Sequence, residues 1–277
     1  MFINLVRIGL LKLTKNRTFR AGIIGIPALF FLVIISFNIL LVWTRIYLDY
    51  GDTFTGGGIT EWQQKGFIVA LYITSVFLLL DVIIVICDYY EYRQVINIEG
   101  AIRSRVKLCL SEITAVFIFS FIAAFYTMVL SFAGVIRDGV ENFILCVYPV
   151  VTLKTYIASA LTMFDMALPA VFLSKLIRKK LPVVVLYISY HFLSSILIVA
   201  LSTIAEYGTA GSSVSLESTL TLDLVYMIFH PTSLLLSHAM GDSSVIIGLP
   251  QVLACYLINV IFWVSLSMIA SRRKVVL

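Results

Sequence analysis

The stretch CLSEITAVFIFSFIAAFYTMVLSFAG, residues Cys109–Gly134, carries one charged side chain, Glu112, in 26 residues. A helix needs about 20 predominantly apolar residues to cross the hydrocarbon layer of a bilayer. Lipid offers no hydrogen-bond partner to open backbone groups, so an apolar run of this length is stable there as a helix. The stretch therefore predicts a transmembrane helix.

Five further runs of this kind bring the predicted number of spans to six. Hydrophobic residues make up 61% of the 277-residue chain and charged residues 13%, about half the charged fraction of ordinary globular domains. We predict an all-α polytopic membrane protein that forms one membrane domain, residues 1–277, with its first run as an uncleaved anchor. The six runs are Gly22–Tyr47, Gly66–Cys87, Cys109–Gly134, Thr152–Ser174, Leu181–Thr203 and Gly248–Ala270.

The positions of Lys and Arg predict the orientation of these spans. Sixteen of the 20 basic residues fall in four segments that share one side of the membrane if all six runs cross it. Positive charge is retained in the cytoplasm, so both termini are predicted to be cytoplasmic. Because the basic pI has this origin, it does not indicate nucleic-acid binding. The four segments are Arg7–Arg20, Arg93–Lys107, Lys175–Lys180 and Arg272–Lys274.

The residues before the first run read as an amphipathic helix. Phe2, Leu5, Val6, Leu10 and Leu13 share one side, while Asn4, Arg7, Thr14 and Lys15 gather on the other. A helix of this kind lies in the membrane interface with its basic face toward anionic head groups. The alternative is an N-terminal anchor that only fixes the topology.

The long outer segment before the sixth run contains FHPTSLLLSHAMG, residues 229–241, which is apolar but too interrupted to span. We expect short interfacial or re-entrant helices there. His230 and His238 are eight residues apart with no third ligand nearby, and the four cysteines have no metal-ligand spacing. We therefore predict no metal site.

Polar side chains inside two of the runs lie on single helical stripes. Ser159, Thr162 and Asp165 share a face of the fourth run, and Tyr187 and His191 share a face of the fifth. Ionisable groups at membrane depth normally face protein or water, so these five residues are candidates for an interior pathway. The alternative is structural, because Ser and Thr also bond their own helix backbone or join helices.

Motifs for catalysis are absent from the sequence. It contains no G-x-x-x-x-G-K-[ST] loop for a nucleotide, no H-E-x-x-H and no G-x-S-x-G. We predict no catalytic residues, and no cofactor bound by this chain.

The whole layout resembles the permease subunits of ABC-2-type transporters, exporters with six spans per subunit. The features that carry the resemblance are the basic amphipathic segment Phe2–Arg20, the six spans, the charged segment Asp88–Lys107 and the apolar FHPTSLLL before the sixth span. Within the charged segment, Glu91–Gly100 followed by Arg103–Lys107 is similar to the family's E-x-x-x-(x)-G and R-x-R/K pattern. The Pro often found ahead of the Ser-Arg pair is missing at Ser104–Arg105.

This resemblance implies roles for two segments. The N-terminal helix, with Arg7, Lys12 and Lys15, would be the elbow helix. The segment after the second span would form a cytoplasmic coupling helix that docks on a separate ATPase subunit, which binds ATP and Mg²⁺. The docking residues on this interpretation are Tyr89, Glu91, Tyr92, Arg93, Gln94, Ile96 and Glu99. A solvated amphipathic loop lying on the head groups is the alternative.

The resemblance further implies a complex of two permease and two ATPase subunits in the bacterial plasma membrane, with identical or different permeases. Its substrates would be amphipathic or hydrophobic peptides, as in the bacitracin-resistance, lantibiotic-immunity and phenol-soluble-modulin exporters, or else lipids or drugs. Two other classes stay open: a non-transporting sensor or scaffold, and a proton-driven secondary carrier.

Overall fold

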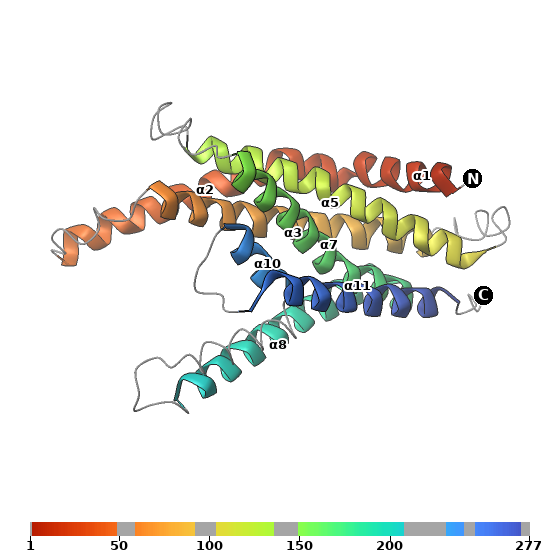
Figure 1. Ribbon diagram of the computed structural model, residues 1–277. Coiled ribbons are helices and arrows are strands. Elements are labelled where there is room, and N and C mark those ends of the chain that lie inside the picture. The colour runs from red at the N-terminus through yellow and green to blue at the C-terminus, as the bar shows by residue number, and fades with distance from the viewer. Residues whose placement is uncertain are drawn as a thin grey trace.

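The computed structural model describes the backbone of residues 2–48, 59–91, 104–135, 149–207, 231–240 and 247–272. Side chains are described for residues 2–33, 70–90, 104–131, 153–194, 196, 200, 231–239 and 247–272. Within these ranges every regular element is an α-helix (Figure 1). The predicted all-α class is therefore confirmed for the described part of the chain.

Six long helices coincide with the six apolar runs. They are α2 (Arg17–Leu48), α3 (Ile59–Glu91), α5 (Arg105–Val135), α7 (Pro149–Ile177), α8 (Lys180–Tyr207) and α11 (Leu249–Arg272). Four stretches among the described residues are long and apolar enough to cross a membrane: Ala70–Tyr90, Arg105–Ser131, Leu153–Ile177 and Leu249–Arg272. Helix α1 (Phe2–Lys15) and the described part of α2 meet the same condition only as a pair bent by 52°. The chain thus has the character of a multi-pass membrane protein, while six spans remain a prediction.

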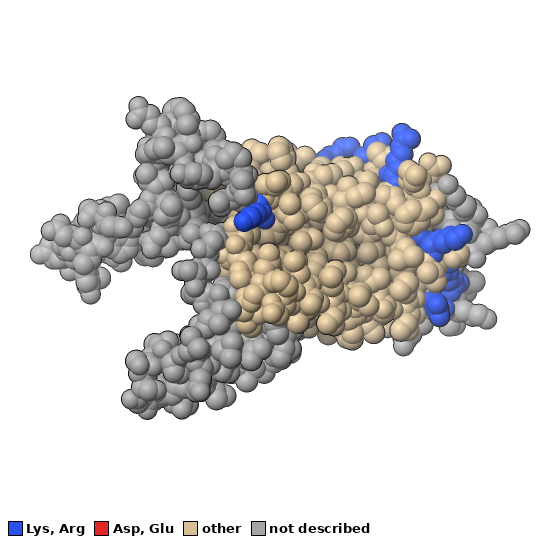
Figure 2. Space-filling view, viewed as in Figure 1, with Lys and Arg blue, Asp and Glu red and all other residues tan. Residues whose placement is uncertain are grey.

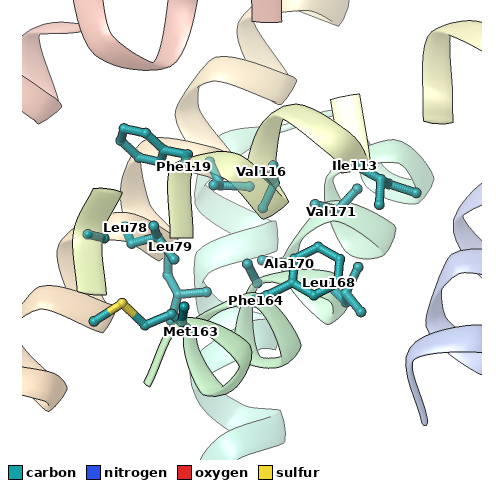
Figure 3. Packing of buried hydrophobic residues seen from close by; sticks show 14 of the residues in the cluster. Leu78, Leu79, Ile113, Val116, Phe119, Met163, Phe164, Leu168, Ala170 and Val171 are labelled. Carbon is teal, nitrogen blue, oxygen red and sulfur yellow. The ribbon is translucent and has the colours of Figure 1, made fainter. Parts of the chain in front are cut away.

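Helices α3, α5 and α7 form the centre of the bundle. Their inward faces meet in one apolar cluster, in which Leu79, Val116 and Met163 each come from a different helix (Figure 3). Buried alanines such as Ala124, Ala160 and Ala167 accompany these larger side chains. Small residues let helix backbones approach closely, and close packing is what holds helices together where lipid is as apolar as the helix surface.

Helix α1 packs lengthwise against the first half of α5 (Figure 1). Its buried residues are Val6, Gly9 and Leu13, spaced as one face of a helix. A Cβ atom on Gly9 would lie 2.9 Å from the Cβ of Ala115, so a glycine is what this approach requires. The predicted apolar side is confirmed for Val6 and Leu13, but Phe2 is exposed.

A short helix, α10 (Pro231–Met240), precedes α11 and packs against α7 and α11. Pro231 stands at its first position, where the missing N–H costs no helical hydrogen bond. The Nε2 atom of His238 donates to the carbonyl of Ile247, 2.7 Å away. This side chain therefore joins α10 to the residues that lead into α11, and His230 lies outside the described residues.

Charged side chains and exposed apolar side chains are distributed unevenly over the bundle. On the face seen in Figure 2, most of the Lys and Arg side chains gather at the end that carries both termini, and uncharged surface covers the length of the bundle. Helix α8 separates from the other helices as it runs toward Tyr207 (Figure 1). Helices α8 and α11 expose many large apolar side chains, including Phe192, Ile258 and Phe262, as lipid-facing helices do.

Candidate functional site

A cluster of charged and aromatic side chains joins five helices at the end of the bundle that carries the termini. We call this cluster the charged joint. It consists of Lys12 on α1, Asp88, Tyr89 and Tyr90 on α3, Glu112 on α5, and Lys175, Arg178 and Lys180 at the end of α7 and the start of α8.

The centre of the charged joint is a buried ion pair between α5 and α7. The Nζ atom of Lys175 donates to Oε2 of Glu112 at 2.5 Å, and the Lys175 residue is only 1% exposed. Removing two charges from water costs several kcal/mol per ion, which their mutual attraction offsets only in good geometry. The pair therefore binds α5 and α7 to each other, since neither charge is stable there without its partner.

The turn between α7 and α8 is held from α3. Arg178 has a φ of 64°, a left-handed conformation that ends α7, and its N–H donates to the carbonyl of Ser174 at 3.0 Å. Its guanidinium lies 5.0 Å from the centre of the Tyr90 ring, a cation–π contact. Two residues later, Lys180 pairs with Asp88 at 2.5 Å. The last turns of α3 thus fix the position of this turn.

The predicted elbow-helix residues have different surroundings. The Nζ atom of Lys12 lies 3.4 Å from the centre of the Tyr89 ring, whereas Arg7 and Lys15 are exposed. A cation held over an aromatic face gains roughly 0.5–2 kcal/mol, depending on how far it is desolvated. Lys12 therefore connects α1 to the last turns of α3.

Of the predicted docking residues, Tyr89 is the one whose side chain is described. It is buried under Lys12 within this chain. Glu91 is the last residue of α3, and its side chain lies outside the described set. Tyr92, Arg93, Gln94, Ile96 and Glu99 lie outside the described residues altogether, so docking stays a prediction for them.

The candidate pathway residues come together where α7, α8 and α11 meet. Both carboxylate oxygens of Asp165 accept from Nδ2 of Asn259 on α11, at 3.0 and 3.3 Å. The hydroxyl of Tyr187 donates to the carbonyl of Met166 at 3.0 Å. His191 in turn hydrogen-bonds the Tyr187 hydroxyl through Nε2. Tyr187 thus connects His191 to α7 at the residue after Asp165, and the role of these residues in a pathway stays a prediction.

The two hydroxyl residues of the fourth run behave differently. Ser159 donates to the carbonyl of Thr155 at 2.5 Å, and Thr162 donates to the carbonyl of Ala158 at 2.8 Å. Both side chains are buried and both hydrogen bonds stay within α7. For these two residues the structural alternative fits the geometry, because the hydroxyls satisfy their own helix.

Several residues of this second cluster were not predicted from the sequence. Asn259 is the partner of Asp165, and Tyr256 on the same helix donates to the carbonyl of Leu161 at 3.4 Å. The rings of Tyr190 and Trp263 lie 5.9 Å apart and join α8 to α11. A lone amide inside an apolar run, as Asn259 is, would have been the signal to look for.

In the part of the chain that the structure describes, no three His, Cys, Asp or Glu side chains come close enough to hold a metal ion. The carboxylates of both clusters are instead paired within the chain, Glu112 with Lys175, Asp88 with Lys180 and Asp165 with Asn259. No protein-family model matches the chain, and no curated protein does either.

Proposed function

We propose that this chain is the membrane-spanning permease subunit of an ATP-driven ABC exporter. On this proposal it crosses the bacterial plasma membrane six times with both termini in the cytoplasm. A separate ATPase subunit binds ATP and Mg²⁺, and this chain has no ATPase site of its own. A second permease subunit, identical or different, completes the membrane part of the complex.

The observation that carries the proposal is the charged joint. The proposed docking segment follows α3, which ends at Glu91, and precedes α5, which begins at Arg105. On one side of that segment Asp88, Tyr89 and Tyr90 contact α1 and the α7–α8 turn. On the other side Glu112 is tied to Lys175. A force applied to this segment would therefore be passed to three other helices, α1, α7 and α8, which is what a coupling segment must do.

The cluster around Asp165 supports the choice of substrate class. It combines a carboxylate, an amide and a histidine with several aromatic rings between α7, α8 and α11. Ligand sites with a few fixed polar groups among aromatic side chains suit molecules that have both polar and apolar parts. We propose amphipathic or hydrophobic peptides as substrates, with toxin or antimicrobial peptides as the leading case.

Co-purification with charge reversal tests the proposal. The tagged full-length chain would be purified from native membranes in mild detergent, and P-loop ATPase and ATP hydrolysis would be measured in the eluate. The double variant Glu91→Lys with Arg93→Glu reverses both charges of the proposed docking surface while keeping the net charge. We expect it to reduce the recovered ATPase by about tenfold or more, as removal of a charged interface contact does.

The matched control is Lys154→Glu, which reverses an exposed charge on α7 near the opposite end of the bundle. It should leave the recovered ATPase unchanged. Equal recovery from the wild type and the double variant would refute docking through this segment. Recovery of partners without ATPase activity would instead favour a sensor or scaffold.

A further inference from the structure

A cavity of about 260 Å³ lies between α2, α3 and α5, away from both clusters described above. Its walls are almost entirely apolar and include Ile26, Phe77, Leu78 and Phe119. Leu78 and Phe119 lie at the margin of the core in Figure 3. The volume is just below the roughly 300–1,000 Å³ of sites for drug-sized molecules. The cavity therefore has room for a slender ligand, such as a head group with part of one aliphatic chain.

Asp81 is the charged residue in the wall of this cavity. The residue is 1% exposed, and its Oδ1 atom accepts from Nδ2 of Asn16 at 2.7 Å. Its Oδ2 atom is buried without a hydrogen-bond partner in the described structure. Arg17 and Arg20, the basic residues at the start of α2, are exposed. A buried carboxylate oxygen without a hydrogen-bond partner lowers the stability of the protein. A ligand that donates a hydrogen bond to this oxygen would therefore be stabilised there.

Two hydroxyl groups of the wall have partners within the protein. The hydroxyl of Thr74 donates to the carbonyl of Ala70 at 2.8 Å, and that of Tyr126 donates to the carbonyl of Ile23 at 2.8 Å. These two groups have therefore used their hydrogens. The cavity as a whole offers an apolar volume with one strong acceptor, which is complementary to an apolar molecule that ends in a cationic donor.

The position of Asp81 gives such a ligand a direction. On α3, Asp81 is seven residues beyond Thr74, about 10 Å along the helix axis and closer to the end that carries the termini. Ile23 on α2 and Ile122 on α5 line the cavity and are 48% and 45% exposed, so the opening between these helices faces the lipid. A ligand from the membrane would place its head at Asp81 and its chain toward the middle of the bundle.

We infer that this cavity binds an amphiphile that has a primary ammonium head group and places part of one aliphatic chain in the cavity, the ammonium donating to Oδ2 of Asp81. The inference does not depend on the transport proposal, because it concerns direct binding to the chain without an ATPase. Its ligand could be a membrane lipid with an ethanolamine head group or a free amphipathic amine.

Photolabelling tests the inference. The purified full-length chain would be placed in nanodiscs of phosphatidylcholine and phosphatidylglycerol and labelled with dodecylamine that carries a diazirine in its chain. We expect adducts on α2, α3 and α5 at residues that line the cavity. Unlabelled dodecylamine should compete at least about tenfold better than dodecanol, because only the amine provides a charge-assisted hydrogen bond.

Three variants identify the group responsible. Asp81→Asn removes the charge and should weaken labelling about tenfold. Lys179→Gln removes a charge at an exposed position outside the cavity and should label like the wild type. Ala123→Leu keeps the carboxylate but fills the cavity from α5, and it should abolish cavity labelling. If Asp81→Asn does not fold, the Ala123→Leu variant and the comparison of amine with alcohol on the wild type carry the test.

Competition by phosphatidylethanolamine distinguishes the two ligand sources. Strong competition by this lipid assigns the site to a membrane lipid, and competition by dodecylamine alone assigns it to a free amphiphile. Equal competition by dodecanol, unchanged labelling of Asp81→Asn, or adducts confined to the exposed faces of α8 and α11 would each overturn the inference.

Discussion

Asp165 and Asp81 are both buried aspartates in long apolar helices, and each has one asparagine partner from another part of the chain. At Asp165 the amide of Asn259 reaches both carboxylate oxygens. At Asp81 the amide of Asn16 reaches only Oδ1, and Oδ2 is left without a partner beside a cavity. The aspartate at position 165 thus connects α7 to α11 through both of its oxygens, whereas the aspartate at position 81 keeps one oxygen without a hydrogen-bond donor.

The two aspartates differ in hydrogen bonding because their asparagine partners occupy different positions in the fold. Asn259 lies inside α11, whose packing against α7 holds the amide opposite the carboxylate. Asn16 is the single residue between α1 and α2, at a bend of 52°. The bend turns α2 away from α1 where α2 passes α3, and the cavity lies along this part of α2. A buried carboxylate therefore connects helices where a neighbouring helix supplies donors to both of its oxygens, as at Asp165. Where one oxygen has no donor and faces a cavity, as at Asp81, the carboxylate can bind a ligand.

In the pair of Glu112 and Lys175, both charges are buried and each has the other as its partner. Changing this pair gives the largest expected loss in the free energy of unfolding. Lys175→Ala leaves Glu112 buried without its counter-charge, which typically costs about 3–5 kcal/mol of stability. We expect a loss of this size in the free energy of unfolding, measured by titration with a denaturing detergent.

The exposed neighbour Lys179 provides the control, and Lys179→Ala should change the free energy of unfolding by less than about 0.5 kcal/mol. The double variant Glu112→Met with Lys175→Met should recover most of the stability, because apolar residues of similar volume replace a buried pair well. A double variant as unstable as Lys175→Ala would show that packing, and not the uncompensated charge, causes the loss.

Substitutions of Asp165 and Asp81 should have smaller effects on stability, and these effects should differ between the two residues. Asp165→Asn weakens the hydrogen bonds with Asn259 and should destabilise the protein by about 1 kcal/mol. Asp81→Asn keeps an acceptor for Asn16 but removes a buried charge whose second oxygen is unpartnered, so stability should stay the same or rise. The measurement is the unfolding of both variants under identical detergent conditions. Equal destabilisation of the two would mean that the open oxygen of Asp81 has a donor in solution.

The helices were predictable from the sequence because apolar run length decides them directly. Each of the six runs coincides with a helix, and Val6 and Leu13 form the buried side of α1 as expected. The role of Gly9 was not predicted, because its contact with Ala115 depends on how closely α1 approaches α5. Periodicity along one helix carries no information about the distance to another.

The candidate sites were predictable only as stripes. The faces of Asp165 on α7 and of Tyr187 and His191 on α8 could be read from the spacing along each helix, but Asn259 required knowledge of which helix packs opposite Asp165. Lys175 was counted as one of the basic residues that orient the chain, and nothing in the sequence distinguishes it from the exposed Lys179. Burial of a charge is a property of the assembled bundle.

Transport by the reconstituted complex tests the central claim most directly. The chain would be placed in proteoliposomes with and without its ATPase subunit, and movement of an amphipathic peptide would be followed with ATP or with an imposed pH gradient. The permease proposal predicts transport that requires both ATP and the ATPase subunit and persists when the pH gradient is collapsed. Transport by the chain alone on a pH gradient would contradict it and identify a secondary carrier.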